Sequence, residues 1–310
     1  MEFWSNNSCV LSWSSYLSQW WQSKKVGVLE NTPMPRKVSF PAGCAIVSGK
    51  QEHTPIIKEF WYRYFSISSK CKCLIPEDFL KRMITSLSWE LWLVINSRGE
   101  IIGTVVRKRL GEIQIGDQSM KEAYMVDYFC VHPAWRKKGI GRGLLNHLHN
   151  QTKHPFSPHF ILWEGVQASI PPISSGIYWW REGKGININT QIKKQILENK
   201  PLTPTKNDIF SRTFSKEETS IWQMSKGVVY IWNTFHRTMP EGKELYILLH
   251  GTSEEAIEEY MNTLETDKII LRPRGITEAI LPGWNYDSPY QWVVYNLRYT
   301  GGYSYPVFMS

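Results

Sequence analysis

The sequence lacks several features that mark other classes of protein. Its five cysteines are an odd number, and none has the paired spacing of a zinc site; they are Cys9, Cys44, Cys71, Cys73 and Cys130. No hydrophobic run approaches the length needed to cross a bilayer, and the acidic, tryptophan-rich start does not resemble a signal peptide. We therefore expect no metal centre, no transmembrane segment and a reducing, cytoplasmic compartment.

Basic residues are in excess, but they form no block. Lys and Arg number 36 against 28 Asp and Glu, which gives a formal net charge of +8. Such an excess suggests a polyanionic partner, and nucleic acid is the usual interpretation. Because the basic residues are scattered, with no arm or long run of like charge, an anionic cofactor and general surface charge explain the excess better than nucleic acid.

Residues 126–148, VDYFCVHPAWRKKGIGRGLLNHL, predict a strand, a basic turn and a helix. β-Branched and aromatic residues make up the strand, and Pro133 ends it because proline cannot continue a ladder. Leu144, Leu145 and Leu148 then repeat at helical spacing.

The turn between this strand and helix suits phosphate binding. Its glycines let backbone N–H groups approach an anion, the helix N-terminus adds a favourable field, and basic side chains add charge-assisted contacts. A solvated surface turn is the alternative. The residues expected to bind phosphate are Arg136, Lys137, Lys138, Gly139, Ile140, Gly141, Arg142 and Gly143.

This element resembles the coenzyme A loop of the GNAT acyltransferase superfamily. The superfamily signature is Arg/Gln-x-x-Gly-x-Gly/Ala, which residues 136–141 match as RKKGIG. A closer likeness is to the N-myristoyltransferases (glycylpeptide N-tetradecanoyltransferases), in which a strand ends in Asn-Phe-Leu-Cys-Val-His. Residues 127–132 read Asp-Tyr-Phe-Cys-Val-His.

Two later segments carry the same resemblance, and two departures limit it. Residues 177–181, IYWWR, are similar to the family's Arg-Tyr-Trp-His-Arg, and residues 291–297, QWVVYNL, to its Gln-Tyr-Tyr-Leu-Tyr-Asn-Trp. Residues 66–73 contain no acid, where the family has an acidic run that helps to receive the peptide, and Trp180 replaces a histidine. We expect the coenzyme site to be kept, while peptide selectivity stays open.

Hydrophobic patterns predict an α/β (α+β) protein. The expected helices are 54–67, one beginning at 76–78, the amphipathic helix after the basic turn, 188–197 and 253–264; the expected strands are 45–47, 89–95, 101–106, 113–115, 120–131, 160–163, 228–235, 245–250, 269–271 and 291–299. The resemblance implies a GNAT-like mixed sheet flanked by helices, in two fused halves of which the second is reduced. The units would be an N-terminal arm (1–37), an acyl-CoA-binding half (38–182), a helix and linker (183–220), and a reduced half (221–310) whose C-terminus returns to the active site.

The resemblance also implies catalytic roles. The backbone N–H groups of Tyr128 and Phe129 would hold the thioester oxyanion, with an ordinary paired core strand as the alternative. The terminal carboxylate of Ser310 would be the base, with a docked but inert terminus as the alternative. Trp20 and Trp21 would lie over the coenzyme, as the family's Phe-Trp dipeptide does, or would only anchor the arm.

Three further residues near the turn need an interpretation. Asp127 is an alternative base, although strand alternation predicts that it lies opposite Tyr128 in a surface salt bridge. His132 is expected to be structural, and Cys130 to be a small core residue rather than a nucleophile.

These features predict an acyl-CoA-dependent N-acyltransferase. The most specific hypothesis is transfer of myristate from myristoyl-CoA to the N-terminal glycine amine of a protein or peptide, without a metal and without nucleic acid. The alternatives are an enzyme that transfers a shorter acyl group to another amine, and a catalytically inactive GNAT-like binding or structural protein.

Overall fold

The computed structural model describes residues 27–28, 36–66, 71–115, 118–152, 157–164, 174–185, 218–275, 282–295 and 297–298. Trp20, Trp21 and Ser310 lie outside these residues, as does the helix expected over 188–197.

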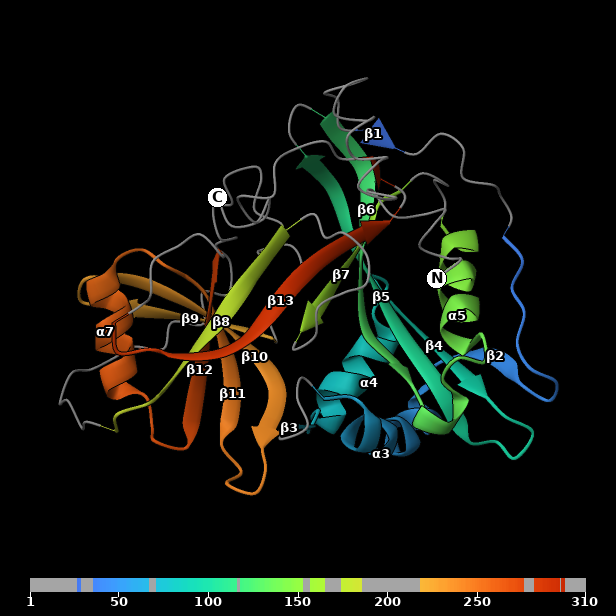
Figure 1. Ribbon diagram of the computed structural model, residues 1–310, viewed down its shortest axis with the longest axis horizontal. Helices are drawn as coiled ribbons and strands as arrows, with labels where there is room; N and C mark the ends of the chain where they lie inside the picture. Colours follow the sequence, from blue (N-terminus) through green and yellow to red (C-terminus); the bar gives the residue numbers. More distant parts are fainter. Residues whose placement is uncertain are drawn as a thin grey trace.

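Among the described residues, twelve strands form one continuous mixed sheet (Figure 1). Its order is β2-β4-β5-β6-β7-β13-β8-β12-β11-β10-β3, and β9 pairs with β10. The strands that precede residue 183 are β2 (Ala45–Ser48), β3 (Cys71–Cys73), β4 (Trp89–Ile95), β5 (Ile101–Ile115), β6 (Gln118–Val131), β7 (His159–Glu164) and β8 (Ser174–Glu182). The later strands are β9 (Thr219–Met224), β10 (Gly227–Thr238), β11 (Glu244–Gly251), β12 (Lys268–Gly275) and β13 (Asn285–Tyr295). Two short strands, β1 (Gly27–Val28) and β14 (Leu297–Arg298), pair with each other.

Helices flank both parts of this sheet. They are α3 (Thr54–Tyr64), α4 (Glu77–Thr85), α5 (Ile140–Asn150) and α7 (Glu254–Thr263), with short 3-10 helices η1 (Gln51–His53) and η2 (Pro133–Trp135). In each part, one helix connects two parallel neighbours: α5 lies between β6 and β7, and α7 lies between β11 and β12. The expected α/β class, with a GNAT-like mixed sheet flanked by helices, is confirmed.

The two parts of the sheet exchange strands. β13, from the C-terminal part of the chain, lies between β7 and β8 and pairs antiparallel with both (Figure 1). β3, from the N-terminal part, pairs with β10. The 38–182 and 221–310 units expected from the sequence therefore share one sheet.

The core of the N-terminal part lies on both faces of the sheet. Leu91 and Leu93 of β4 face α3 and α4, whose buried residues include Trp61 and Leu80. Val94, the next residue along, packs in the cluster that includes the apolar side of α5. Strand alternation therefore places α3 and α4 on one face and α5 on the other.

Arg107 of β5 holds the C-terminal end of α5. Its guanidinium, only 2% exposed, donates to the Leu148 carbonyl oxygen at 2.6 Å and to the Glu90 carboxylate at 2.6 and 2.7 Å. A cation at this end also interacts favourably with the helix dipole. Since this end is held, the N-terminus of α5 has a defined position at the opposite end of the helix.

Candidate functional site

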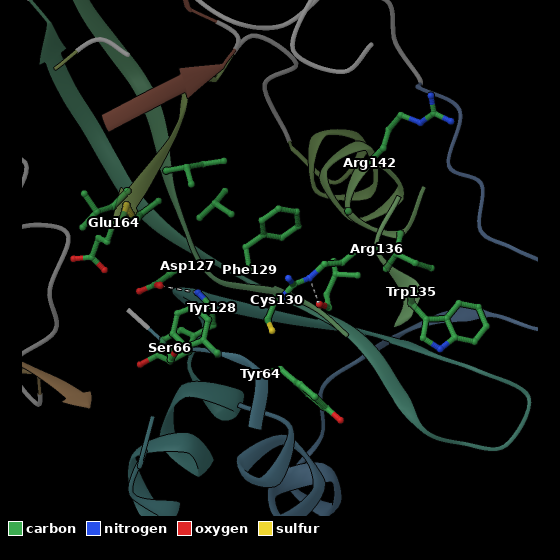
Figure 2. Close-up of a pocket in the computed structure, with 18 of the residues that line it drawn as sticks. Tyr64, Ser66, Asp127, Tyr128, Phe129, Cys130, Trp135, Arg136, Arg142 and Glu164 are labelled. Atoms are coloured by element: carbon green, nitrogen blue, oxygen red, sulfur yellow. Dashed lines mark hydrogen bonds between the residues drawn. The ribbon is translucent and has the colours of Figure 1, made fainter. Parts of the chain in front are cut away.

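A cavity of about 660 Å³ opens where β6 and β7 stop pairing (Figure 2). The last paired residues are Val126 and Ile161, although β6 continues to Val131 and β7 to Glu164. The two strands therefore diverge. Side chains from the end of α3, from β6 and β7, from the basic turn and from Trp232 of β10 line the opening.

β6 has an irregular backbone at the centre of this cavity. Tyr128 has a φ of 46°, a left-handed conformation that a residue with a Cβ adopts only under strain. The pairing with β5 shifts register between Thr104 and Val106, so neither Tyr128 nor Phe129 has a cross-strand partner. The alternative of an ordinary paired strand does not hold at these two residues.

Two linked, buried hydrogen bonds, here called the relay, hold this irregular backbone. The Trp61 Nε1–H donates to Thr104 Oγ1 at 2.9 Å, and the Thr104 hydroxyl donates to the Tyr128 carbonyl oxygen at 2.9 Å. The Trp61 ring also stacks on the Tyr128 ring, with their centroids 4.3 Å apart. α3 and β5 thus fix the conformation of β6 at the site.

The two expected oxyanion donors are in different situations. The Tyr128 N–H donates to Asp127 Oδ1 at 2.6 Å, so this N–H is already bonded. Phe129 has no cross-strand partner on β5, and it lines the cavity. Both residues line the cavity, and the hydrogen bond to Asp127 distinguishes Tyr128 from Phe129.

Among the described residues, Asp127 does not form the expected surface salt bridge. It is half-buried, lines the cavity and binds the following N–H group. Burial raises the pKa of Asp127 to about 6, and the negative charge of Glu218 adds to the rise while Lys108 opposes it. The prediction was wrong because it assumed regular alternation, which the left-handed Tyr128 interrupts.

The basic turn lies at the N-terminus of α5. Lys137 and Gly139 have φ values of 61° and 85°, and the first bond of the helix runs from the Gly143 N–H to the Gly139 carbonyl oxygen, at 2.8 Å. The N–H groups of the first turn thus have no partner within the helix, and they are suited to bind an anion. Six of the expected phosphate-binding residues line the cavity: Arg136, Lys137, Gly139, Ile140, Gly141 and Arg142.

Lys138 and Gly143 are placed differently from these six. The Lys138 Nζ lies 4.8 Å from the centre of the Trp135 ring. A Cβ at Gly143 would collide with the Phe40 ring, so this glycine permits close packing on the far side of α5. Neither residue lines the cavity.

Sequence reasoning missed Glu164, which lies at the end of β7 and lines the cavity. Its Oε1 accepts a hydrogen bond from the Tyr178 hydroxyl at 2.8 Å. Burial raises the pKa of Glu164 to about 7; the Tyr178 bond lowers it, and the charges of Asp127 and Asp287 raise it further. A single acid that ends an apolar strand, FILWE, was the available signal.

Cys130 and His132 have the structural roles that were expected. Burial raises the pKa of the Cys130 thiol to about 12, so it is protonated at neutral pH and is a poor nucleophile. The His132 Nδ1 accepts from the Ala134 N–H at 3.2 Å and holds the start of η2. Within the described ranges, no cluster of His, Cys, Asp or Glu could hold a metal ion. Of the helices in these ranges, none is long and apolar enough to span a membrane.

Comparison with known proteins points to one fold. Residues 88–167, which contain β6 and the basic turn, match the acetyltransferase (GNAT) domain. No curated protein matches the chain. A structure of Saccharomyces cerevisiae N-myristoyltransferase with bound myristoyl-CoA is similar at 10% identity and a TM-score of 0.68, over 96% of this chain and 92% of that chain.

Two further structures of the yeast enzyme agree with the first. One, also with bound myristoyl-CoA, is 9% identical with a TM-score of 0.64, over 100% of this chain and 90% of that chain. The other, with myristoyl-CoA and inhibitors, is 8% identical with a TM-score of 0.62, over 93% and 89%. The predicted resemblance is thus confirmed at the level of the fold: residues 88–167 match the GNAT domain, and the chain has a fold similar to that of N-myristoyltransferase.

Proposed function

We propose that this protein is an acyl-CoA-dependent N-acyltransferase. The observation that carries the proposal is the cavity, in which the unpaired part of β6 faces the N-terminus of α5 and its basic turn. The match of residues 88–167 to the GNAT domain supports it.

Each part of the cavity has a chemical task in this reaction. The first turn of α5, with Arg136, Lys137 and Arg142, binds the coenzyme pyrophosphate. The Phe129 N–H donates to the thioester oxygen, where negative charge develops during attack by the amine. The amine approaches from the side of β7.

The finer assignments are also proposals. Myristate is the acyl group and an N-terminal glycine is the acceptor, supported by the sequence resemblance and by the myristoyl-CoA bound in the yeast structures. Trp20 and Trp21 cover the coenzyme, and the Ser310 carboxylate reaches the site from the reduced second half. A reducing, cytoplasmic compartment is supported by four free thiols in the described part of the chain: Cys44, Cys71, Cys73 and Cys130.

A second candidate function is acyl-CoA binding without catalysis. The hydrogen bond from the Tyr128 N–H to Asp127 favours it, because this bond removes one of the two oxyanion donors that the resemblance implied.

An acyl-transfer assay separates the two functions. The purified protein is examined by mass spectrometry for bound acyl-CoA, then incubated with acetyl-, octanoyl- or myristoyl-CoA and a peptide with a free N-terminal glycine. We expect transfer that is fastest with myristoyl-CoA, while the N-acetylated peptide, as a control, stays unmodified. Binding without transfer would support the second candidate, and neither binding nor transfer would contradict both.

Removing two cations of the turn should weaken coenzyme binding. We expect Lys137→Ala with Arg142→Ala to raise the dissociation constant for coenzyme A about ten- to a hundredfold, because each loses a charge-assisted contact to phosphate. Titration calorimetry at low and high salt measures this effect, which should shrink at high salt. Lys138→Ala is the matched control, since Lys138 lies over Trp135 and does not line the cavity; an equal loss in this control would contradict the placement.

A further inference from the structure

Asp127 and Glu164 lie at the same end of the cavity. Asp127 follows the last residue of β6 that pairs with β7, and Glu164 ends β7. The divergence of the two strands therefore exposes both carboxyl groups to the same space. Figure 2 shows them on the side of Tyr128 that is remote from Arg136 and the basic turn.

Neither carboxyl group has a cationic partner within hydrogen-bond or ion-pair distance among the described residues. Glu164 Oε1 accepts from the Tyr178 hydroxyl, and no described group donates to Oε2. Asp127 Oδ1 accepts from the Tyr128 N–H. Lys108, the cation that acts on Asp127 through its charge, forms its ion pair with Glu218 instead, at 3.1 Å. Two adjacent acids that open into a cavity without a paired cation suit a cationic ligand.

From this geometry we infer that Glu164 is the general base that deprotonates the amine acceptor, and that Asp127 helps to attract that amine as an ammonium ion. This inference rests on the proposed acyl transfer. It assigns a protonated primary amine as the substrate class and places its binding at the β7 end of the cavity.

In the proposed step, the amine nitrogen loses two protons in turn. The ammonium nitrogen gives one proton to Glu164, and its freed electron pair attacks the thioester carbonyl carbon, so that a C–N bond forms. The oxyanion, held by the Phe129 N–H, then collapses and the C–S bond breaks. The leaving thiolate takes a second proton from the nitrogen, and Glu164 returns its proton to water.

Glu164 suits this role better than Asp127 because the bond from the Tyr128 N–H stabilises the charged form of Asp127 and lowers its basicity. Burial raises the pKa of Glu164 to about 7, near the pH at which a base is most effective. The groups that face Glu164 from neighbouring strands are Tyr178 on β8, Asp127 on β6 and Asp287 on β13.

The main test is Glu164→Gln, which keeps an oxygen for the Tyr178 hydroxyl but cannot take a proton. We expect kcat/KM for the peptide to fall about a hundred- to ten-thousandfold, as for loss of a general base. The dissociation constant for coenzyme A should stay unchanged, which shows that the variant is folded. Glu164→Asp, which keeps the charge on a shorter chain, should recover part of the rate.

The pH profile gives a second readout. Because the ionised form of Glu164 is active, we expect kcat/KM of the unmodified protein to fall as the pH drops below about 7. Asp127→Asn keeps an acceptor for the Tyr128 N–H but removes a negative charge that raises the pKa of Glu164. The acidic limb should therefore move to lower pH in this variant, and a merely structural role would not move it.

The outcomes distinguish this inference from the proposed function. If the unmodified protein transfers acyl groups and Glu164→Gln does so at the same rate with the same pH profile, the inference is overturned and the base lies elsewhere, as at the Ser310 carboxylate. If the unmodified protein binds acyl-CoA but transfers nothing to amines, the proposed function fails and the inference falls with it. A large loss in Glu164→Gln with coenzyme binding intact supports both.

Discussion

Replacing Gly141 by aspartate should weaken coenzyme A binding by more than a hundredfold while leaving the fold stable. Gly141 lies in the first turn of α5 and lines the cavity. A carboxylate there, about 5 Å from a bound phosphate, would repel it by about 3 kcal/mol, which is a loss of more than a hundredfold in affinity. The same charge interacts favourably with the helix N-terminus, so the melting temperature of the free protein should not fall through loss of helix stability.

Gly141→Ala is the matched control for this experiment. An added Cβ would lie 3.0 Å from the Phe129 Cζ, which requires only a small shift of that ring. We expect titration calorimetry to show an affinity within several-fold of the unmodified protein. Retained binding in Gly141→Asp would mean that the phosphates lie away from α5.

Replacing Thr104 by valine should lower the free energy of unfolding by about 2 to 5 kcal/mol. Thr104 is fully buried and its hydroxyl joins the Trp61 indole to the Tyr128 carbonyl oxygen. Valine has almost the same shape but leaves both partners unpaired, and each unpaired buried group costs about 1 to 3 kcal/mol. Denaturant unfolding monitored by tryptophan fluorescence measures the change.

A double-mutant cycle isolates the relay from simple packing. Trp61→Phe removes the indole donor, so it should cost less in the Thr104→Val background than alone, with a coupling of about 0.5 kcal/mol or more. Thr104→Ser keeps the hydroxyl but loses the methyl group, so we expect it to cost less than Thr104→Val. A coupling near zero in the cycle would contradict the relay.

The basic turn and its neighbours could be predicted because their signals are local. Pro133 ends β6, Gly139 takes the left-handed conformation at the start of α5, and the spacing of the leucines fixes the buried side of that helix. The proposed coenzyme end of the site can therefore be predicted from one continuous stretch of sequence.

The amine end of the site could not be read in the same way, because it depends on long-range pairing. Residues 101–106 and 113–115 were expected as separate strands, but they form one strand, β5, which crosses Gly111 with register shifts. The strands β3, β8 and β9 were not predicted at all. The buried environment of Glu164 comes from Tyr178 and from β13, which pairs Tyr290 with it across the ladder.

The residues of the IYWWR segment have contacts that the sequence motif alone did not predict. Tyr178 donates a hydrogen bond to Glu164, which lines the cavity, whereas Arg181 forms an ion pair with Glu258 of α7. β8 thus connects the candidate active site to the helix of the C-terminal part. Trp180, which stands where the family has a histidine, does not line the cavity.

The insertion of β13 between β7 and β8 also determines the order of assembly. During synthesis β7, which carries Glu164, leaves the ribosome well before residues 285–295, and until then its edge toward β13 has no partner. The ladder beside the proposed base is thus completed only when nearly the whole chain is present. A nascent or truncated chain would hold the turn at α5 before the ladder beside Glu164 is complete, so the proposed coenzyme site would form before the proposed amine site.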